Sequence, residues 1–165
     1  MNRKVTLGAF AALALLAGAA CSDDATDPDL EVNFAATLTG AAEKPTPVTT
    51  TATGSATVLI NETAQSFTVT VTIAGTGVVD LSMAHIHVGD VNTAGPIAVN
   101  LLPTAPAAGT FTGTLVGGLT FSTIEAASGE TFATLVAKMR AGNTYINVHN
   151  AVNTAGHIRG QLVAQ

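Results

Sequence analysis

The feature that most constrains the fold is a strict alternation of hydrophobic residues with threonine between positions 67 and 73. The hydrophobic members are Phe67, Val69, Val71 and Ile73, and threonine fills the three positions between them. Successive side chains of a β-strand point to opposite faces, so this pattern predicts a strand with one face in a core and the other in solvent. The β-branched residues also favour extended backbone.

Similar runs recur along the chain, separated by Gly, Pro and Asn. They cover residues 34–38, 55–60, 84–88, 97–102, 110–116, 144–149 and 158–163. Only residues 131–140 have hydrophobic side chains at helical spacing, ending before Gly142. The sequence therefore predicts an all-β protein, either an antiparallel β-sandwich or a flattened Greek-key barrel of about seven to nine strands, with one short helix.

The first 20 residues have the pattern of an export signal. Two basic residues near the start precede an apolar run over 5–17, and three small residues precede Cys21, the single cysteine. This order resembles a bacterial lipoprotein signal peptide, in which the cysteine is acylated and becomes the new N-terminus. An ordinary cleaved signal followed by an incidental cysteine is the alternative.

Five acidic residues follow within positions 23–31, around Pro28. Such a self-repelling segment suits a solvated tether. We therefore expect a signal peptide over 1–20, a lipidated cysteine and acidic tether over 21–31, and a folded domain over 32–165. The protein would be exported and membrane-anchored through its lipid, facing the periplasm or the cell exterior. Which membrane it occupies stays open.

Charge and motifs exclude several functions. Six basic against eleven acidic residues give a net charge of -5 and no concentrated positive surface, which argues against a nucleic-acid partner. The chain has no GxSxG elbow, phosphate-binding loop or paired-carboxylate arrangement, and Cys21 is assigned to processing. We therefore expect no catalytic activity and assign no catalytic residue.

One segment occurs twice. Val-Asn-Thr-Ala-Gly stands at 91–95, the first repeated loop, and again at 152–156, the second repeated loop. Each follows shortly after a strand that ends near a histidine, His87 or His149, and Asn and Gly are suited to turn conformations. The repeat predicts two similar hairpins. Whether their two mouths adjoin in space stays open.

The histidines are the main candidate site. His85 and His87 share one face of a strand, at a spacing that lets two imidazoles reach one metal ion. By alternation His149 and His157 also point away from the aliphatic core. Two interpretations remain: a copper or zinc site formed by His85, His87 and His149, or a polar face whose imidazoles hydrogen-bond to loop backbone.

Neighbouring polar residues have weaker candidate roles. Asp90 fits a hydrogen-bonding partner for an imidazole, or a simple turn residue. Arg159 is predicted to point outward, where its guanidinium would bind an anion with His157 nearby or form a surface ion pair. Tyr145 and Asn147 share the face of His149 and form a polar ladder beside it.

Several motifs together carry a family resemblance. They are Phe34-Ala-Ala-Thr-Leu-Thr-Gly with Glu43 and Pro45, Ala84-His85-Ile86-His87, Gly95-Pro96, Tyr145-Ile-Asn-Val-His149 and Gly156-His157-Ile158-Arg159-Gly160-Gln161-Leu162. These segments resemble the CHRD domain, the repeat first named in chordin, from about Phe34 to Gln165. In animal chordin such domains accompany the binding of secreted growth factors, so the resemblance implies an envelope or extracellular protein partner. His157 replaces the acidic residue of the usual GEIRG pattern.

A second resemblance is to the copper/zinc superoxide dismutases, which are also β-sandwiches. His85-Ile-His87 followed by Gly89-Asp90 is similar to their strand with two copper ligands, and Val148-His149 to a later ligand strand. No histidine lies between His87 and His149 to build a zinc site, and one cysteine cannot form their disulfide. Two function classes follow: a non-catalytic binding or structural module on a lipid tether, or a copper- or zinc-binding metalloprotein related to that enzyme.

Overall fold

The protein's structure, a computed structural model, describes residues 32–102, 109–120 and 128–165. Within these ranges the chain forms nine strands and one α-helix. They are β1 (Val32–Thr39), β2 (Ala52–Asn61), β3 (Ser66–Val79), β4 (Leu81–Val88), β5 (Ile97–Asn100), β6 (Thr110–Thr120), α1 (Phe132–Arg140), β7 (Thr144–Asn150), β8 (Ile158–Gln161) and β9 (Val163–Ala164). The predicted all-β class with one short helix is confirmed.

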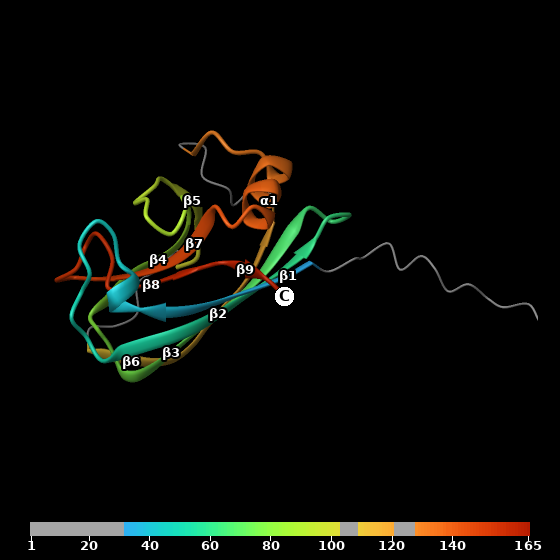
Figure 1. The fold of residues 1–165 in the computed structure, drawn as a ribbon. Helices are drawn as coiled ribbons and strands as arrows, with labels where there is room; N and C mark the ends of the chain where they lie inside the picture. The colour runs from blue at the N-terminus through green and yellow to red at the C-terminus, as the bar shows by residue number, and fades with distance from the viewer. Residues whose placement is uncertain (1–31, 103–108, 121–127) are drawn as a thin grey trace, which may run out of the picture.

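The strands form one curled antiparallel sheet. Its order is β5-β4-β7-β8-β1-β2-β3-β6, and β9 pairs with β1 off this path. The curl brings β4, β7 and β8 above β2, β3 and β6, which gives the sandwich-like profile of Figure 1. The hydrophobic core lies between these two halves.

The alternating residues between positions 67 and 73 face the core and the solvent in turn, as expected. Phe67 and Ile73 are buried in the core, whereas Thr68 between them is exposed. The neighbouring strand β2 alternates buried and exposed residues in the same way and pairs with β3 over its whole length. One face of this half of the sheet therefore lies in solvent.

Helix α1 also forms where its hydrophobic spacing predicts. The side chain of Thr131 accepts a hydrogen bond from the backbone N–H of Thr134, and the hydroxyl of Thr134 accepts one from the N–H of Thr131, so the helix begins with a capping box. The ring of Phe132 packs on that of Phe67 at a centroid distance of 5.0 Å. The helix thereby closes the core beside the sheet (Figure 1).

The run over 158–163 differs in detail from the single strand expected there. Strand β8 pairs with β7, the chain then turns at Leu162, and β9 pairs with β1. Leu162 is fully buried in the core, because this break directs its side chain inward.

The expected signal peptide, the expected lipidation site Cys21 and the expected acidic tether lie outside the described residues. Within the ranges that are described, none of the helical structure is long and apolar enough to cross a membrane.

Candidate metal centre

Two neighbouring strands, β4 and β7, carry three histidines on the face that points away from the core. On β4, Ile86 is buried in the core, so His85 and His87 on either side of it project to the opposite face. On β7, Val148 is buried in the core in the same way and His149 projects opposite to it. Hydrophobic packing on one face thus fixes the direction of the imidazoles on the other.

The strand register brings these imidazoles together. His85 pairs with Asn147 and His87 pairs with Tyr145, so His149 lies diagonally across from His85. One ring nitrogen of each histidine lies within 4.8 Å of those of the other two. The ring centroids are 4.8 to 5.8 Å apart. The three residues proposed as ligands from the sequence therefore form one cluster.

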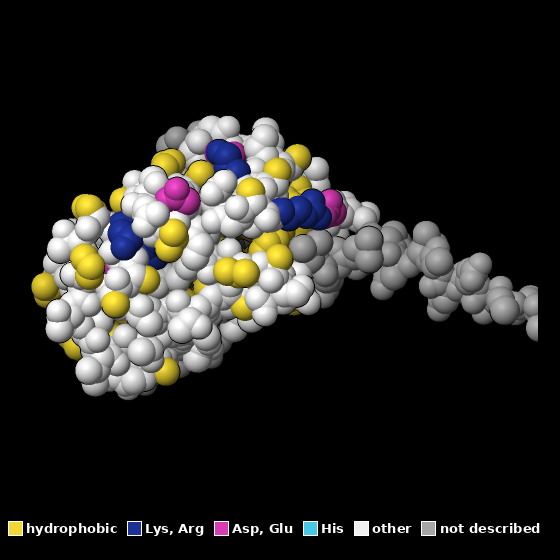
Figure 2. Space-filling model, in the orientation of Figure 1, with side chains coloured by type: hydrophobic (Ala, Val, Ile, Leu, Met, Phe, Trp, Pro, Cys, Tyr) yellow, Lys and Arg dark blue, Asp and Glu magenta, His cyan; other side chains and the backbone are white. Residues whose placement is uncertain are grey.

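All three rings are removed from solvent although they lie outside the aliphatic core. The exposed fractions of His85, His87 and His149 are 2%, 7% and 4%. On the face of the molecule drawn in Figure 2, Lys and Arg side chains are scattered and no histidine reaches the surface. The cluster is therefore a polar interior on the second face of the sheet.

The two repeated loops cover this interior from opposite ends. Strands β4 and β7 are antiparallel, with Val88 beside Thr144 and Leu81 beside Asn150. The first repeated loop follows the end of β4 and the second follows the end of β7. The two hairpin mouths therefore do not adjoin, and each loop reaches the histidines from its own end.

Backbone carbonyls in the loops fix the protonation of two imidazoles. His87 Nδ1 lies 2.9 Å from the carbonyl oxygen of Gly95, and His149 Nδ1 lies 3.0 Å from that of Thr154. A carbonyl only accepts hydrogen bonds, so both Nδ1 atoms carry the proton. Each Nε2 then keeps a lone pair, which is how metal-binding histidines are commonly oriented.

Two of the remaining nitrogens face each other. His85 Nδ1 donates to His149 Nε2 at 3.0 Å. His87 Nε2 is buried and has no hydrogen-bond partner among the described residues. Two nitrogens bound to one tetrahedral ion at 2.0–2.1 Å lie about 3.3 Å apart. The His85–His149 pair at 3.0 Å is near this separation, whereas the nitrogens of the whole cluster lie within 4.8 Å of one another and would draw together around an ion.

The environment keeps the imidazoles neutral. Burial, followed by the neighbouring imidazoles, lowers the pKa of His85 to about 4. Burial also lowers the pKa of His87 to about 4, and it lowers the pKa of His149. Neutral imidazoles have the lone pairs that a metal ion needs.

A stack of planar groups supports His87. The ring of Tyr145 lies parallel to it, with centroids 4.9 Å apart and 9° between the planes. The guanidinium of Arg159 covers the other side of Tyr145, 3.4 Å from the ring centroid, and donates to the backbone oxygen of Asp90. The Tyr145 hydroxyl accepts a hydrogen bond from the N–H of Gly95, whose carbonyl holds His87. Tyr145 thus fixes both the ring and its acceptor.

Arg159 is not the outward guanidinium expected from the sequence. Its exposed fraction is 2%, and it forms no surface ion pair in the described part of the chain. Alternation places it on the second face of β8, and the layer that buries the histidines also buries this side chain. Its Nη1 atom has no hydrogen-bond partner within that part of the chain.

Glu43 is the residue that the site analysis from sequence missed. It follows the turn after β1, is 2% exposed, and accepts a hydrogen bond from Asn147. Burial raises the pKa of Glu43 to about 7, against the opposing effects of Asn147 and Arg159. A Cβ at Gly156 would meet the side-chain ends of Glu43 and Asn147, and the φ of +144° there strains any other residue, so the position favours glycine. The motif containing Glu43 was visible in the sequence, but its spacing gave no sign of the contact with β7.

Asp90 forms a turn and does not contact an imidazole. Its carboxylate accepts hydrogen bonds from the N–H of Asn92 and the hydroxyl of Thr93. These bonds, that of Thr93 first, lower the pKa of Asp90. Asp90 therefore shapes the first repeated loop.

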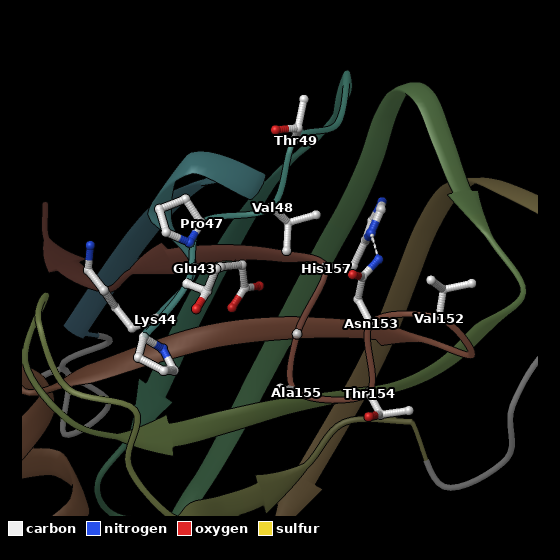
Figure 3. A pocket seen from close by; sticks show the side chains of 13 residues that line it. Glu43, Lys44, Pro47, Val48, Thr49, Val152, Asn153, Thr154, Ala155 and His157 are labelled. Atoms are coloured by element: carbon white, nitrogen blue, oxygen red, sulfur yellow. Dashed lines mark hydrogen bonds between the residues drawn. The ribbon is translucent and has the colours of Figure 1, made fainter.

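His157 lies apart from the cluster. Its ring bonds Thr50 through Nε2 and Asn153 through Nδ1, at 3.2 and 2.8 Å. It lines an open cavity of about 710 Å³ between the segment after β1 and the second repeated loop. Figure 3 shows Glu43 and His157 beside this cavity, with the His157–Asn153 hydrogen bond drawn.

The comparison with protein families agrees with the resemblance seen in the sequence. The family model of the CHRD domain matches residues 34–162. The chain therefore belongs to the CHRD family, and this membership indicates a binding or structural module without catalytic activity. No curated protein and no solved structure matches this chain at a significant level.

Proposed function

We propose that this CHRD domain is an exported, lipid-anchored binding module of the cell envelope that holds one copper or zinc ion with His85, His87 and His149. The observation that carries the proposal is the orphaned Nε2 atom of His87, which is buried beside two other imidazoles. A buried nitrogen lone pair without a partner is costly, and a metal ion would satisfy it.

The competing interpretation, a polar face bonded to loop backbone, accounts for only part of this arrangement. The bonds from His87 to Gly95 and from His149 to Thr154 are of the kind it requires. With both Nδ1 atoms bonded in this way, His149 Nε2 faces His85 and His87 Nε2 is left buried without a partner among the described residues. Loop bonding alone gives no reason for three buried imidazoles to converge, whereas a metal site does.

Binding of an ion would replace the hydrogen bond between His85 and His149. His149 Nε2, which accepts from His85 Nδ1 in the structure, would serve as a ligand instead. His85 would then carry its proton on Nε2, and its Nδ1 would be free to serve as a ligand. All three residues remain neutral imidazoles, which suit copper and zinc better than calcium or magnesium.

The proposal is tested by titrating the metal-free purified protein with Zn²⁺ and Cu²⁺ in a calorimeter. A Cys21→Ser background removes the single thiol as a competing ligand. We expect one ion per chain, and a loss of affinity greater than about 100-fold in His87→Ala, because a ligand matters more than its supporting residues.

His157→Ala is the matched control, since it removes a histidine outside the cluster. Circular dichroism checks that each variant keeps its β-sheet. Absence of saturable binding by the parent protein, or equal binding by folded His87→Ala, would overturn the metal site.

Export and anchoring rest on the basic and apolar residues before Cys21 and on the acidic segment after it. Cells grown with labelled fatty acid should incorporate the label into the protein, which should sediment with membranes. Cys21→Ser should lose the label and the membrane association. A Cys21→Ser protein that is cut at the same place and stays in the membrane would contradict the anchor.

A further inference from the structure

Strand β4 contains a bulge that changes which side chains face the histidines. Between Asn150 and His149, strand β7 advances by one residue, while β4 advances by two, from Leu81 to Met83. Residues two apart on a regular strand share a face. Here Leu81 is buried in the core, but Met83 is outside it and 40% exposed. The bulge at Ser82 therefore separates Leu81, which faces the core, from Met83, which lies on the histidine face with His85.

Met83 is the immediate neighbour of two of the three imidazoles. It stands directly opposite His149 in the register, where Cβ atoms of paired residues are about 4.5–5.5 Å apart. It also precedes His85 by two positions on the same face of β4. A flexible thioether with three rotatable bonds can turn from solvent toward the ion from this position.

The other methionine in the described part of the chain shows the contrast. Met139 on α1 is fully buried and packs in the core. Met83 has no such packing role, and it is one of the few large hydrophobic side chains that are exposed. Met83 thus lies outside the core, beside a register shift and next to the imidazoles in the strand register.

We propose that Met83 supplies a thioether as the fourth ligand and makes the centre a copper site that binds Cu⁺ in preference to Zn²⁺. Thioether sulfur is a soft ligand that selects Cu⁺, whereas three imidazoles alone accept either metal. This inference rests on the proposed function and adds the identity of the metal to it.

The test compares the parent protein with Met83→Leu, which keeps the size and apolar character of the side chain. Cu⁺ affinity is measured without oxygen by competition with a coloured Cu⁺ chelator, and Zn²⁺ affinity by calorimetry. Loss of the soft ligand should weaken Cu⁺ binding by about tenfold or more and leave Zn²⁺ binding within about twofold. Val79→Ala, which trims an exposed hydrophobic residue on β3, should change neither affinity.

X-ray absorption at the copper edge gives the second readout. The parent protein should show a sulfur neighbour of copper that Met83→Leu lacks. A nitrogen-only copper shell in the parent protein, or equal Cu⁺ affinities in both proteins, would overturn the role of Met83 and leave the three-histidine site standing. Failure of the parent protein to bind any ion would overturn both.

Discussion

The two halves of the curled sheet use the same strand geometry in opposite ways. Along β2, buried residues alternate with residues that are exposed or half-buried, and the outward positions include Thr53, Ser55 and Thr57. Along β7, all seven residues are buried. Both strands supply one face of the hydrophobic core. The difference is a second buried layer over β7, which the two repeated loops and the segment after β1 provide.

The side chains buried by this second layer are mostly polar. They include three histidines, Glu43, Asn147 and Arg159, and several of them have nitrogen or oxygen atoms without a partner among the described residues. Burying polar groups in this way costs free energy that a solvated threonine face avoids. Among the described residues, this cost falls on the half of the sheet that carries the histidine cluster.

The largest expected effect is a loss of folding stability when a side chain is removed from the hydrophobic core, which both halves of the sheet face. Ile86→Ala removes a fully buried side chain from the core, and should lower the free energy of unfolding by about 2–5 kcal/mol in a denaturant titration. Thr57→Ala on the solvated face of β2 should change it by no more than about 0.5 kcal/mol. Equal effects would contradict the assignment of the two faces.

The close packing of the second layer predicts the next effect. Gly156 has φ +144°, and an added Cβ would meet Glu43 and Asn147. Gly156→Ala should therefore cost about 2–4 kcal/mol of unfolding free energy, from strain and crowding together. Gly142→Ala, at φ +70° with open space around it, should cost only about 1 kcal/mol. Equal losses in thermal or chemical unfolding would show that the layer over β7 is loosely packed.

Variants of Tyr145 test whether stacking on the imidazole of His87 contributes to metal affinity beyond burying that ring. Tyr145→Leu removes the ring that stacks on His87 and should weaken Zn²⁺ binding by about 10–100-fold, as losses of groups around metal ligands do. Tyr145→Phe keeps the ring and should weaken binding less. If calorimetry gives the same affinity for Tyr145→Leu as for the parent protein, then stacking contributes nothing to the site.

The smallest effect is a pH dependence that only the polar half should have. The pKa of Glu43 rises from an ordinary 4.5 to about 7 on folding, so the folded state binds its proton more tightly than the unfolded state does. This group therefore stabilises the fold most below pH 4.5, and its contribution is lost as pH rises toward 7. Relative to the parent protein, Glu43→Gln should gain on the order of 1 kcal/mol in stability between these pH values. A difference that stays constant with pH would contradict this account.

Periodicity in the sequence was enough to predict most of the strands, the helix and the direction in which the histidines point. The alternation over residues 67–73 and the helical spacing over 131–140 are local signals, and local geometry determined both. The convergence of His85, His87 and His149 also needed the register of β4 on β7, which the sequence suggested only through the repeated loops.

The remaining features depend on contacts between distant segments. The burial of Arg159 and the role of Glu43 arise from a layer formed by three separate loops, and no period in the sequence encodes that layer. The bulge at Ser82 shifts the pattern by one residue, so alternation alone would have assigned Leu81 to the histidine face together with Met83 and His85. Such non-local features are also the ones that shape the candidate site.

The most direct test of the account observes the ring nitrogens themselves. Nitrogen-15 NMR of the histidine rings should be recorded on the metal-free protein and again after one equivalent of Zn²⁺. We predict that the Nε2 signals of His87 and His149 move to the range of metal-bound nitrogen, that their Nδ1 atoms stay protonated, and that His157 is unchanged. Ring signals of His85, His87 and His149 that do not respond to Zn²⁺, or a response confined to His157, would contradict the metal centre.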